Sequence, residues 1–392
     1  MRRHQTLSVR LRKPLERSLR SGHPWLYREA LEAFEAAPGT AVRVLDRKGG
    51  FVASGLCEAG PIAVRVFSVQ DRAIDAGLFA ERIDAALELR RRFQLPETDA
   101  YRLLHGEGDR LPGVVCDRYG SRAVLKLDGE AALSLAASWT QLLRERLPAL
   151  GVETLLVRTS RKHGESVSVA WGPEPPRELE VRERGMALVV NLYDGQKTGL
   201  FLDHRESRAR VRGLAAELSV LNLYGYTGGF SIAAGLGGAA QVTTVDQAKP
   251  ALALADRSWT ANGLPAERHQ SRAGDVVEYL TAAADRGDRH GLIIADPPNF
   301  APRQSALEQA LRAYEALHAG VLKLLSPGGL YLAASCSSHV DRSAFEQTLY
   351  DGARRARRVL QVLERSGAPA DHPRLLAFPE GDYLKVALLR AD

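Results

Sequence analysis

The sequence contains few sulfur-bearing residues. Its 392 residues include two methionines and three cysteines, and the cysteines are Cys57, Cys116 and Cys336. So few thiols exclude a disulfide-stabilised scaffold, and their wide separation excludes the short cysteine spacings of zinc sites. We therefore expect a protein that folds in a reducing compartment, the cytoplasm, and that uses no metal.

Long apolar runs are also missing. No stretch approaches the roughly 18 consecutive apolar residues that a membrane-spanning helix requires. The first residues, MRRHQTLSVRLRKPLERSLR, have no apolar core and alternate as a strand does at Leu7, Val9 and Leu11. This pattern argues against a secretory signal. The sequence thus predicts a cytoplasmic protein without a membrane partner.

Acidic residues are slightly outnumbered by basic ones. The 53 Lys and Arg against 47 Asp and Glu give a net charge of +6 and a pI of about 9.3. This excess is a weak sign of a nucleic-acid partner, because a compositional preference for arginine produces the same balance. A more local sign is LERSLRSGHPWLY, where arginines neighbour Trp25 and Tyr27. Such a surface suits RNA binding. The equally weighted alternative is that Trp25 belongs to the hydrophobic core.

The length predicts two or three domains. Residues 1–72 contain short alternating runs separated by Gly and Pro, which predict a small β domain. Residues 73–175 combine a helical pattern, a hairpin and a further strand, as an α+β domain does. Residues 176–392 begin with a β-hairpin and continue as alternating strands and helices. This last pattern predicts an α/β domain with a parallel, doubly wound sheet.

The stretch SVLNLYGYTGGFSIAAGLGGAAQVTTVD has the order strand, glycine-rich turn, helix, strand, acid. Gly225, Gly228 and Gly229 would allow a ligand to approach the backbone at a helix N-terminus, and Asp246 stands where a carboxylate binds ribose hydroxyls. Neither G-x-G-x-x-G nor the P-loop pattern is present, which favours a single adenosyl group over a dinucleotide or ATP. Asp275, at the predicted end of a third strand, either binds the adenine amino group or caps the next helix.

Two reactive side chains follow apolar, strand-like runs: Asp296 in IIADPPNF and Cys336 in LAASCSS. In an open parallel sheet these strand ends face one crevice. A thiol and an acid together suit methylation at carbon 5 of a pyrimidine, because thiolate addition at carbon 6 makes carbon 5 nucleophilic. We expect a nearby helix N-terminus to lower the pKa of Cys336. The alternatives are a buried structural cysteine and a solvated aspartate in a turn.

The four residues after Asp296 predict a pocket for a planar base. Pro297 and Pro298 lack backbone donors and would hold the turn rigid. Asn299 and Phe300 would line the pocket, and Phe300 would stack on the base.

These motifs resemble the RlmI/RlmO-type bacterial 23S ribosomal RNA (cytosine-5) methyltransferases, class I enzymes that use S-adenosylmethionine. The resemblance extends over nearly the whole chain and rests on GQKTGLFLDHRESR, LNLYGYTGGFSIAAGLGGA, IIADPPNFA, SCS and DHPRLLAFPEGDYLK. It implies a PUA-type RNA-binding domain over 1–72, an α+β middle domain over 73–175 and a Rossmann-like methyltransferase domain over 176–392. It also implies 23S ribosomal RNA as a partner and a homodimeric assembly.

The same resemblance implies roles for individual residues. Cys336 would be the nucleophile, and Asp296 would hold the cytosine edge beside the cofactor. Asp246 would bind the ribose and Asp275 the adenine. The other residues implied to surround or close over the cofactor are Phe201, Asp203, Arg205, Asn222, Tyr224, Gly225, Tyr226, Thr227, Gly228 and Gly229.

The chain departs from the family pattern at two positions. Related cytosine enzymes often carry a second cysteine in D-x-P-C, where this chain has Asn299, and His204 replaces a commoner glutamine. Two alternatives stay open: a sister group that methylates guanine N7, with asparagines in place of residues 335–337, and a non-catalytic RNA-binding protein. Cys336 favours cytosine, because guanine N7 is already nucleophilic and needs no covalent catalyst.

Overall fold

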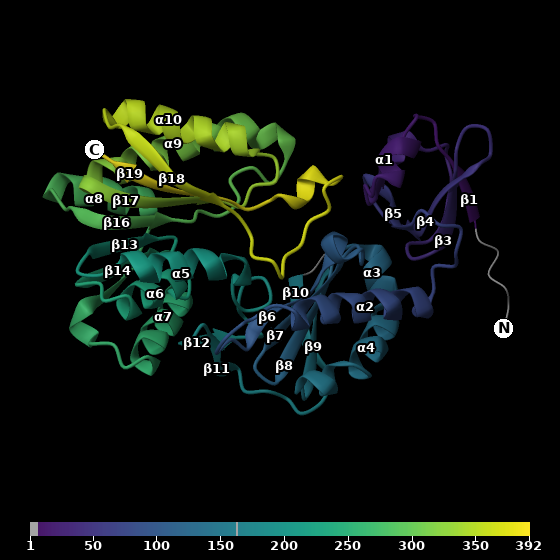
Figure 1. Cartoon of the computed structure of the whole chain (residues 1–392), viewed down its shortest axis with the longest axis horizontal. Helices are drawn as coiled ribbons and strands as arrows, with labels where there is room; N and C mark the ends of the chain where they lie inside the picture. The colour runs from purple at the N-terminus through teal and green to yellow at the C-terminus, as the bar shows by residue number, and fades with distance from the viewer. Residues whose placement is uncertain (1–6, 162–163) are drawn as a thin grey trace. The chain divides into compact units, whose positions relative to one another are not determined.

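The computed structural model describes residues 7–161 and 164–392, and these form two compact units (Figure 1). The first unit contains the described residues of 1–95 and 99–177 together with Ala370–Gly381. The second contains Pro96–Thr98, Glu178–Pro369 and Asp382–Asp392. The chain passes from one unit to the other near residue 177. The three predicted domains, 1–72, 73–175 and 176–392, stay a prediction.

The first unit begins with a five-stranded sheet in the order β1-β3-β4-β5-β2. Val42 and Val44 alternate with more exposed neighbours and are fully buried, so one face of the sheet forms a core. Trp25 is half-buried and packs edge-on against Phe378, with ring centroids 4.6 Å apart. The elements of this sheet are β1 (Leu7–Arg10), α1 (Glu16–Arg20), β2 (Trp25–Tyr27), β3 (Ala41–Leu45), β4 (Phe51–Cys57) and β5 (Ile62–Ser68).

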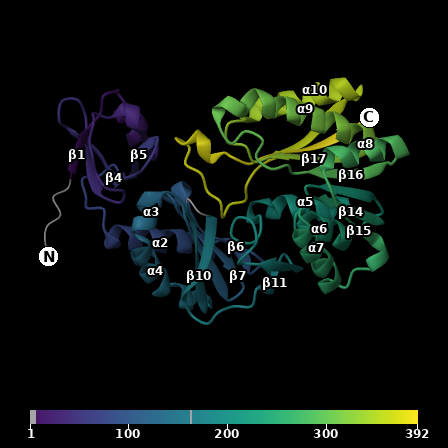
Figure 2. The ribbon, with the colours of Figure 1, turned by 180° about the vertical axis from the view of Figure 1, so that it is seen from behind.

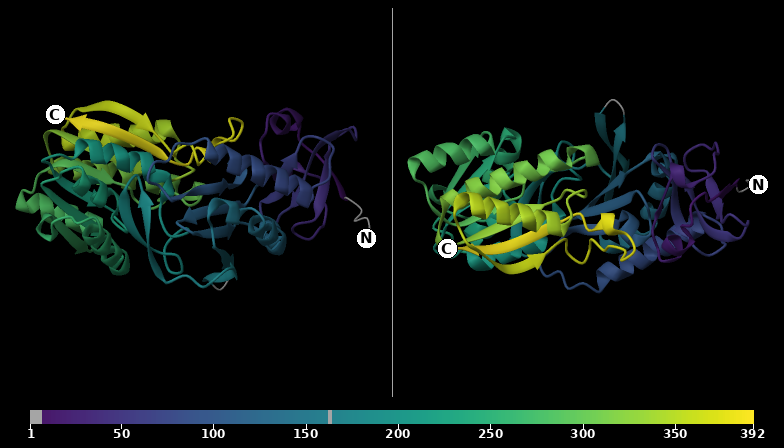
Figure 3. Two further views of the ribbon diagram at one scale, coloured as in Figure 1. Left: turned by 60° about the horizontal axis from the view of Figure 1, so that its bottom comes forward. Right: turned by 90° about the horizontal axis from the view of Figure 1, so that it is seen from above.

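A second five-stranded sheet of this unit has the order β10-β9-β8-β7-β6, and Figure 3 shows β9 and β10 as a long hairpin. The predicted β7–β8 hairpin is confirmed, and Gly120 has a positive φ of 62° in its turn. The strands are β6 (Ala100–His105), β7 (Val114–Tyr119), β8 (Arg122–Leu127), β9 (Thr154–Arg161) and β10 (Gly164–Trp171). The helices are α2 (Ala76–Arg91), α3 (Glu130–Ser134) and α4 (Ala136–Arg144). Phe79 and Trp139 pack at the centre of their common core.

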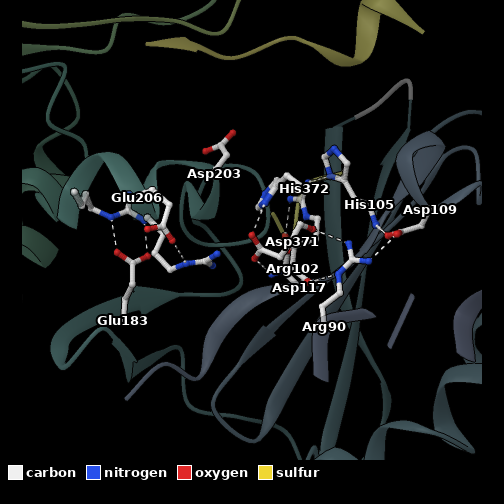
Figure 4. Close-up of polar contacts among 12 residues, drawn as sticks. Arg90, Arg102, His105, Asp109, Asp117, Glu183, Asp203, Glu206, Asp371 and His372 are labelled. Atoms are coloured by element: carbon white, nitrogen blue, oxygen red, sulfur yellow. Dashed lines mark hydrogen bonds and ion pairs between the residues drawn. The ribbon is translucent and has the colours of Figure 1, made fainter. Parts of the chain in front are cut away.

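Residues 370–381 return to the first unit through a buried polar network (Figure 4). The Asp371 carboxylate is fully buried and accepts the backbone N–H of Arg102 at 3.0 Å. Arg90 donates to the Asp371 carbonyl at 2.6 Å. Arg102 in turn forms a two-pronged ion pair with Asp117 at 2.7 and 3.0 Å. No local sequence pattern predicts this return.

The second unit begins with the predicted hairpin of β11 (Glu178–Glu183) and β12 (Met186–Asn191). Arg184 and Gly185 form its turn with φ values of 48° and 78°. Two consecutive positive φ values are typical of the type I′ turn, whose twist matches that of the strands.

A seven-stranded sheet forms the centre of the second unit, in the order β15-β14-β13-β16-β17-β19-β18. All pairs are parallel except those of β19, which runs antiparallel to β17 and β18. The strands are β13 (Ser219–Leu223), β14 (Gln241–Asp246), β15 (His269–Ala273), β16 (His290–Ala295), β17 (Leu325–Ser335), β18 (Leu360–Ser366) and β19 (Lys385–Ala391). The predicted α/β class is confirmed, and the antiparallel β19 is an addition that the alternation did not reveal.

Helices cover both faces of this sheet, as Figures 1 and 2 show. One face carries α8 (Val276–Arg286), α9 (Leu307–Leu324) and α10 (Arg342–Ala356). The other carries α5 (Arg205–Leu214), α6 (Gly229–Leu236) and α7 (Lys249–Ala261). Since both faces are covered, the central strands are mainly apolar, and Leu221 and Ile293 have no exposed surface. Among the described residues, no helix is long and apolar enough to cross a membrane.

Candidate active site

A cavity of about 890 Å³ opens in the second unit at the carboxyl ends of β13, β14, β16 and β17. Parallel strands present the loops that follow them on one edge, so this is where a doubly wound sheet binds ligands. The cavity lining includes Asp246, Asp296 and Cys336, which follow three of these strands. The sequence prediction that the acid and the thiol face a common crevice is therefore confirmed.

The turn between β13 and α6 is tightly packed. Tyr224 and Tyr226 both have positive φ, at 57° and 47°, and both line the cavity. A Cβ on Gly225 would lie 2.4 Å from a side-chain carbon of Thr244, so no larger residue fits there. Gly228 has a φ of 75°, and its Cβ would lie 2.6 Å from that of Ala255. The glycines thus allow an unusual backbone conformation in the turn that borders the cavity.

Asp246 holds this turn in place. One carboxylate oxygen accepts the backbone N–H of Tyr226 at 2.8 Å, and the other accepts that of Ala248 at 2.8 Å. Each oxygen keeps a lone pair for a further donor. Because Asp246 also lines the cavity, its carboxylate is suitably placed for the predicted ribose contact.

Asn222 lies beneath the turn instead of in the cavity lining. Its amide donates to the Ser231 hydroxyl at 2.9 Å, and that hydroxyl lies 2.6 Å from the hydroxyl of Thr244. Asn222 is 1% exposed and does not line the cavity. Asn222 therefore links β13 to α6 in this structure, and its direct contact with the cofactor stays a prediction.

Asp275 caps a helix, which is one of its two predicted roles. Its carboxylate accepts the backbone N–H groups of Val277 and Glu278 at 2.8 and 3.1 Å and so caps α8. The other oxygen accepts the Gln247 amide at 2.8 Å. Asp275 also lines the cavity, so the cap leaves the adenine contact open.

The FLDHR segment contributes Phe201, Asp203 and His204 to the cavity lining, within and before the short helix Leu202–His204. The Phe201 ring packs edge-on against that of Tyr226 at 5.3 Å. Asp203 accepts the Tyr383 hydroxyl at 2.7 Å. Arg205, by contrast, is 2% exposed, pairs with Glu206 at 3.3 Å and does not line the cavity.

Arg208 is a lining residue that the sequence analysis missed. Its guanidinium forms a buried, two-pronged ion pair with Glu183 at 2.7 and 2.5 Å. It also donates to the Phe201 carbonyl at 2.9 Å. The RESR spacing places Arg208 one turn after Arg205, which was the available signal.

His204 and Asp296 form an ion pair in the cavity, with 3.1 Å between Nε2 and a carboxylate oxygen. Burial opposes the charged imidazole, but the charge and hydrogen bond of Asp296 prevail and raise the pKa of His204. Its Nδ1 is buried without a hydrogen-bond partner among the described residues. The sequence analysis left the role of His204 open, and the structure gives it the role of partner to Asp296.

The Cys336 thiol is half-buried and donates a weak hydrogen bond to the Pro297 carbonyl at 3.9 Å. Burial, followed by the charge of Asp296, raises its pKa to about 11, and Lys197 opposes this rise. The expectation of a pKa lowered by a helix N-terminus is wrong. The next helix, α10, begins only at Arg342 and is capped by Asp341, so its amides do not point at the thiol.

The segment after Asp296 divides between the cavity and the protein interior. Pro297, Pro298 and Phe300 line the cavity, as predicted for a base pocket. Asn299 does not, because its amide oxygen accepts the Ser337 hydroxyl at 2.7 Å and the Ala301 N–H at 3.0 Å. Asn299 thereby ties the acid loop to the cysteine loop.

No group of three or more His, Cys, Asp or Glu side chains with a metal-binding arrangement occurs in the described part of the chain.

Comparison with known proteins identifies this kind of site. The model of a family of S-adenosylmethionine-dependent methyltransferases matches residues 132–389. The chain belongs to this family. A ribosomal RNA large subunit methyltransferase of Deinococcus radiodurans is 36% identical over 98% of both chains. Ribosomal RNA large subunit methyltransferase I of Erwinia tasmaniensis is 36% identical over 97% of this chain and 98% of its own length.

The methyltransferase also matches a PUA-like domain model over residues 9–69. A solved protein from Streptococcus mutans, assigned as a SAM-dependent methyltransferase, superposes with a TM-score of 0.88 at 25% identity. It covers 98% of this chain and all of its own. The solved structure of SMU.776, with the same TM-score and identity, is a complex with S-adenosylhomocysteine and covers 98% and 99% of the two chains.

The cofactor of the methyltransferase is S-adenosylmethionine, and the residues of the cavity fit it. The volume lies within the range of small-molecule sites. Two carboxylates, Asp246 and Asp275, line the cavity at neighbouring strand ends, and the predicted contacts to ribose hydroxyls and an adenine amino group would be made there.

Replacing Asp246 by alanine is expected to weaken S-adenosylmethionine binding by about 1.5–3 kcal/mol, because a charge-assisted hydrogen bond to the ribose is lost. Asp246→Asn keeps an acceptor for one backbone N–H and separates the loss of charge from loosening of the turn. Isothermal titration calorimetry on both variants measures the effect, with thermal unfolding as the control for folding. An unchanged dissociation constant for the alanine variant would contradict the ribose role.

Proposed function

We propose that the methyltransferase acts on carbon 5 of a cytosine in 23S ribosomal RNA, with Cys336 as a covalent catalyst and Asp296 as its acidic partner. The observation that carries this proposal is the presence of both side chains in the cavity that contains the glycine turn and Asp246. The relatives named as ribosomal RNA large subunit methyltransferases support the choice of RNA.

The bound cofactor supplies an electrophilic methyl group. The Cys336 thiol first loses its proton to solvent, and the thiolate forms a bond from Sγ to carbon 6 of the cytosine. This addition makes carbon 5 nucleophilic, and the electron pair of the former carbon 5–carbon 6 double bond forms the bond from carbon 5 to the methyl group. The carbon 5 proton leaves to a base, the bond from Sγ to carbon 6 breaks, and the thiolate is restored. One proton is released for each methyl group transferred.

The His204–Asp296 pair is our candidate for the group that handles protons at the base. No second thiol follows Pro298, and Asn299 is engaged with Ser337 outside the cavity lining. Asp296 lines the cavity and is ion-paired with His204, whose pKa is raised by that contact. A carboxylate in such a pair can hold the cytosine edge and accept a proton in turn.

RNA containing 5-fluorocytidine is expected to trap this chemistry. Fluorine cannot leave carbon 5 as a proton does, so the adduct with Cys336 persists after methyl transfer. We expect a protein–RNA complex that survives denaturing electrophoresis when S-adenosylmethionine is present, with the crosslink mapped to the Cys336 peptide by mass spectrometry. Cys57→Ala, which alters a buried cysteine of the first unit, serves as the control that retains trapping.

Analysis of ribosomal RNA nucleosides by mass spectrometry distinguishes the alternatives. 5-Methylcytidine that depends on the enzyme supports the proposal. 7-Methylguanosine in its place would favour the sister activity, and unmodified RNA that is nevertheless bound would favour a binding protein.

We further propose that the PUA-like domain binds the RNA, that the enzyme works in the cytoplasm and that it forms a homodimer. The basic net charge and the Arg-rich stretch around Trp25 support RNA binding. Light scattering after size-exclusion chromatography tests the assembly, for which a single-chain mass would contradict the proposal.

A further inference from the structure

Lys385 is a buried ammonium outside the predicted set of site residues. It is the first residue of β19 and is 1% exposed. Its Nζ donates to the carbonyls of Ser337 and Tyr383 at 2.6 and 2.8 Å. No carboxylate of the described residues forms an ion pair with it. A buried cation that is bound only by carbonyls costs stability, so another role must explain it.

The position of Lys385 brackets the nucleophile. In the β17–β19 register, Lys385 lies opposite Ser335, the residue before Cys336. Its ammonium binds the carbonyl of Ser337, the residue after Cys336. A single residue thus contacts the chain on both sides of the cysteine, Ser335 through the strand pairing and Ser337 through the ammonium, while the thiol itself reaches the cavity.

The environment of Lys385 disfavours its charged form more than the neighbouring negative charges favour it. Burial lowers its pKa to about 8, and the charge of Cys336 is the largest opposing influence. Asp382 and Asp341 also oppose this lowering, while Arg342 adds to it. Lys385 is therefore mostly charged at pH 7 and loses its proton near pH 8, well below the range of an exposed lysine.

The surroundings of Cys336 likewise disfavour its charged form, the thiolate. Burial and the carboxylates of Asp296 and Asp203 disfavour its thiolate, and Lys197, an exposed residue of the cavity lining, favours it. The charge of Cys336 favours the Lys385 ammonium, and because a Coulomb interaction acts on both partners, the ammonium in turn favours the thiolate.

We propose that Lys385 is a positioning residue for Cys336: its fixed ammonium, held between the Ser337 and Tyr383 carbonyls, stabilises the thiolate that attacks the RNA base. The inference rests on the proposed nucleophilic role of Cys336. It adds a residue that touches neither cofactor nor RNA and acts through the charge state of the thiol.

The rate of Cys336 alkylation by iodoacetamide, followed by mass spectrometry of the full-length protein's peptides, tests this directly. Lys385→Gln keeps a hydrogen-bond donor but removes the charge, and it is expected to slow alkylation at pH 7 about tenfold, equivalent to one pKa unit. Lys385→Arg keeps the charge and is expected to restore most of the rate. Lys323→Gln, which neutralises an exposed lysine elsewhere in the cavity lining, is the matched control and should leave the rate unchanged.

The pH profile gives a signature that a purely structural lysine lacks. The gap between wild type and Lys385→Gln should narrow above pH 8, because the ammonium itself is then lost. The buried Cys57 and Cys116 report unfolding of the first unit, and thermal unfolding followed by circular dichroism reports opening of the second. If the Lys385→Arg variant unfolds, the inference is judged only from the pH profiles of Cys336 alkylation in wild type and Lys385→Gln. Equal alkylation in wild type and a folded Lys385→Gln overturns the inference.

Thermal unfolding provides a second test of whether Lys385 has a structural role. Lys385→Met is expected to melt at the same or a higher temperature at pH 7, because a lysine with a lowered pKa destabilises the fold while charged. A large loss of stability together with unchanged alkylation would assign Lys385 a structural role. Neither measurement uses RNA, so a failure to form 5-methylcytidine would count against the proposed function and leave this inference to be judged separately.

Discussion

Replacement of Cys336 by alanine is expected to reduce methyl transfer at least about 10³-fold, which corresponds to about 4 kcal/mol of lost transition-state stabilisation. The reason is that carbon 5 of cytosine has no other route to become nucleophilic in this cavity. Binding of S-adenosylmethionine should be unchanged, because Cys336 lies at the end of β17 while the glycine turn and Asp246 lie at the ends of β13 and β14. Single-turnover transfer of a labelled methyl group to ribosomal RNA measures the loss.

The matched control is Cys116→Ala, which removes a thiol of the same size from the core of the first unit. It should lower stability modestly and leave the rate per folded molecule intact. Retained turnover in Cys336→Ala would end the covalent mechanism and favour direct methylation of an already nucleophilic atom such as guanine N7.

Asp296→Asn is expected to lower turnover about 10²–10⁴-fold, because an amide can neither take up nor return a proton. It should also destabilise the fold by about 1–3 kcal/mol, since His204 loses a charged hydrogen-bond partner in a buried place. His204→Gln, which removes only the titrating partner, should lower turnover about tenfold. Equal turnover for Asp296→Asn and wild type would remove Asp296 from the mechanism.

The pH dependence of stability separates the pair from other contacts. The pKa of His204 is raised above 6.5 in the folded protein, so the folded state holds its proton more tightly than the unfolded chain does. The stabilisation is complete below pH 6.5 and disappears as the pH rises through the raised pKa. Unfolding free energies of wild type and His204→Gln should therefore converge at alkaline pH. A constant difference from pH 6 to pH 9 would refute the ion pair as its source.

The sequence predicted the site best where chemistry and backbone pattern coincide. Asp246 ends its strand, and Asp296 and Cys336 directly follow theirs. Because parallel strands present their carboxyl ends at one edge of the sheet, the sequence predicted that these side chains share a crevice. Asn222 and Asn299 carry the same kind of polar side chain but turn inward, to Ser231 and Ser337. Nothing local distinguishes an inward from an outward amide, because tertiary partners decide it.

The environment of Cys336 was less accessible to sequence reasoning. Its pKa depends on Asp203 and Lys197, which precede it by more than a hundred residues, and on the distance to the next helix. Lys385 was hidden for a related reason. The run KVALLRA is readable as a strand, but its insertion beside β17 is a matter of topology, and only that placement brings the ammonium to the cysteine loop.

The return of residues 370–381 to the first unit has a consequence for biosynthesis. Asp371 completes the buried network of Arg90 and Arg102, yet it leaves the ribosome 194 residues after Arg177 (371 − 177), the residue that closes the main part of that unit. At about 5–20 residues per second, the two arginines wait roughly 10–40 s for their partner. A nascent chain stopped at residue 177 can therefore form the Arg90–Asp109 and Arg102–Asp117 ion pairs but lacks the two acceptors that Asp371 supplies. The part of the protein made first is thus finished almost last.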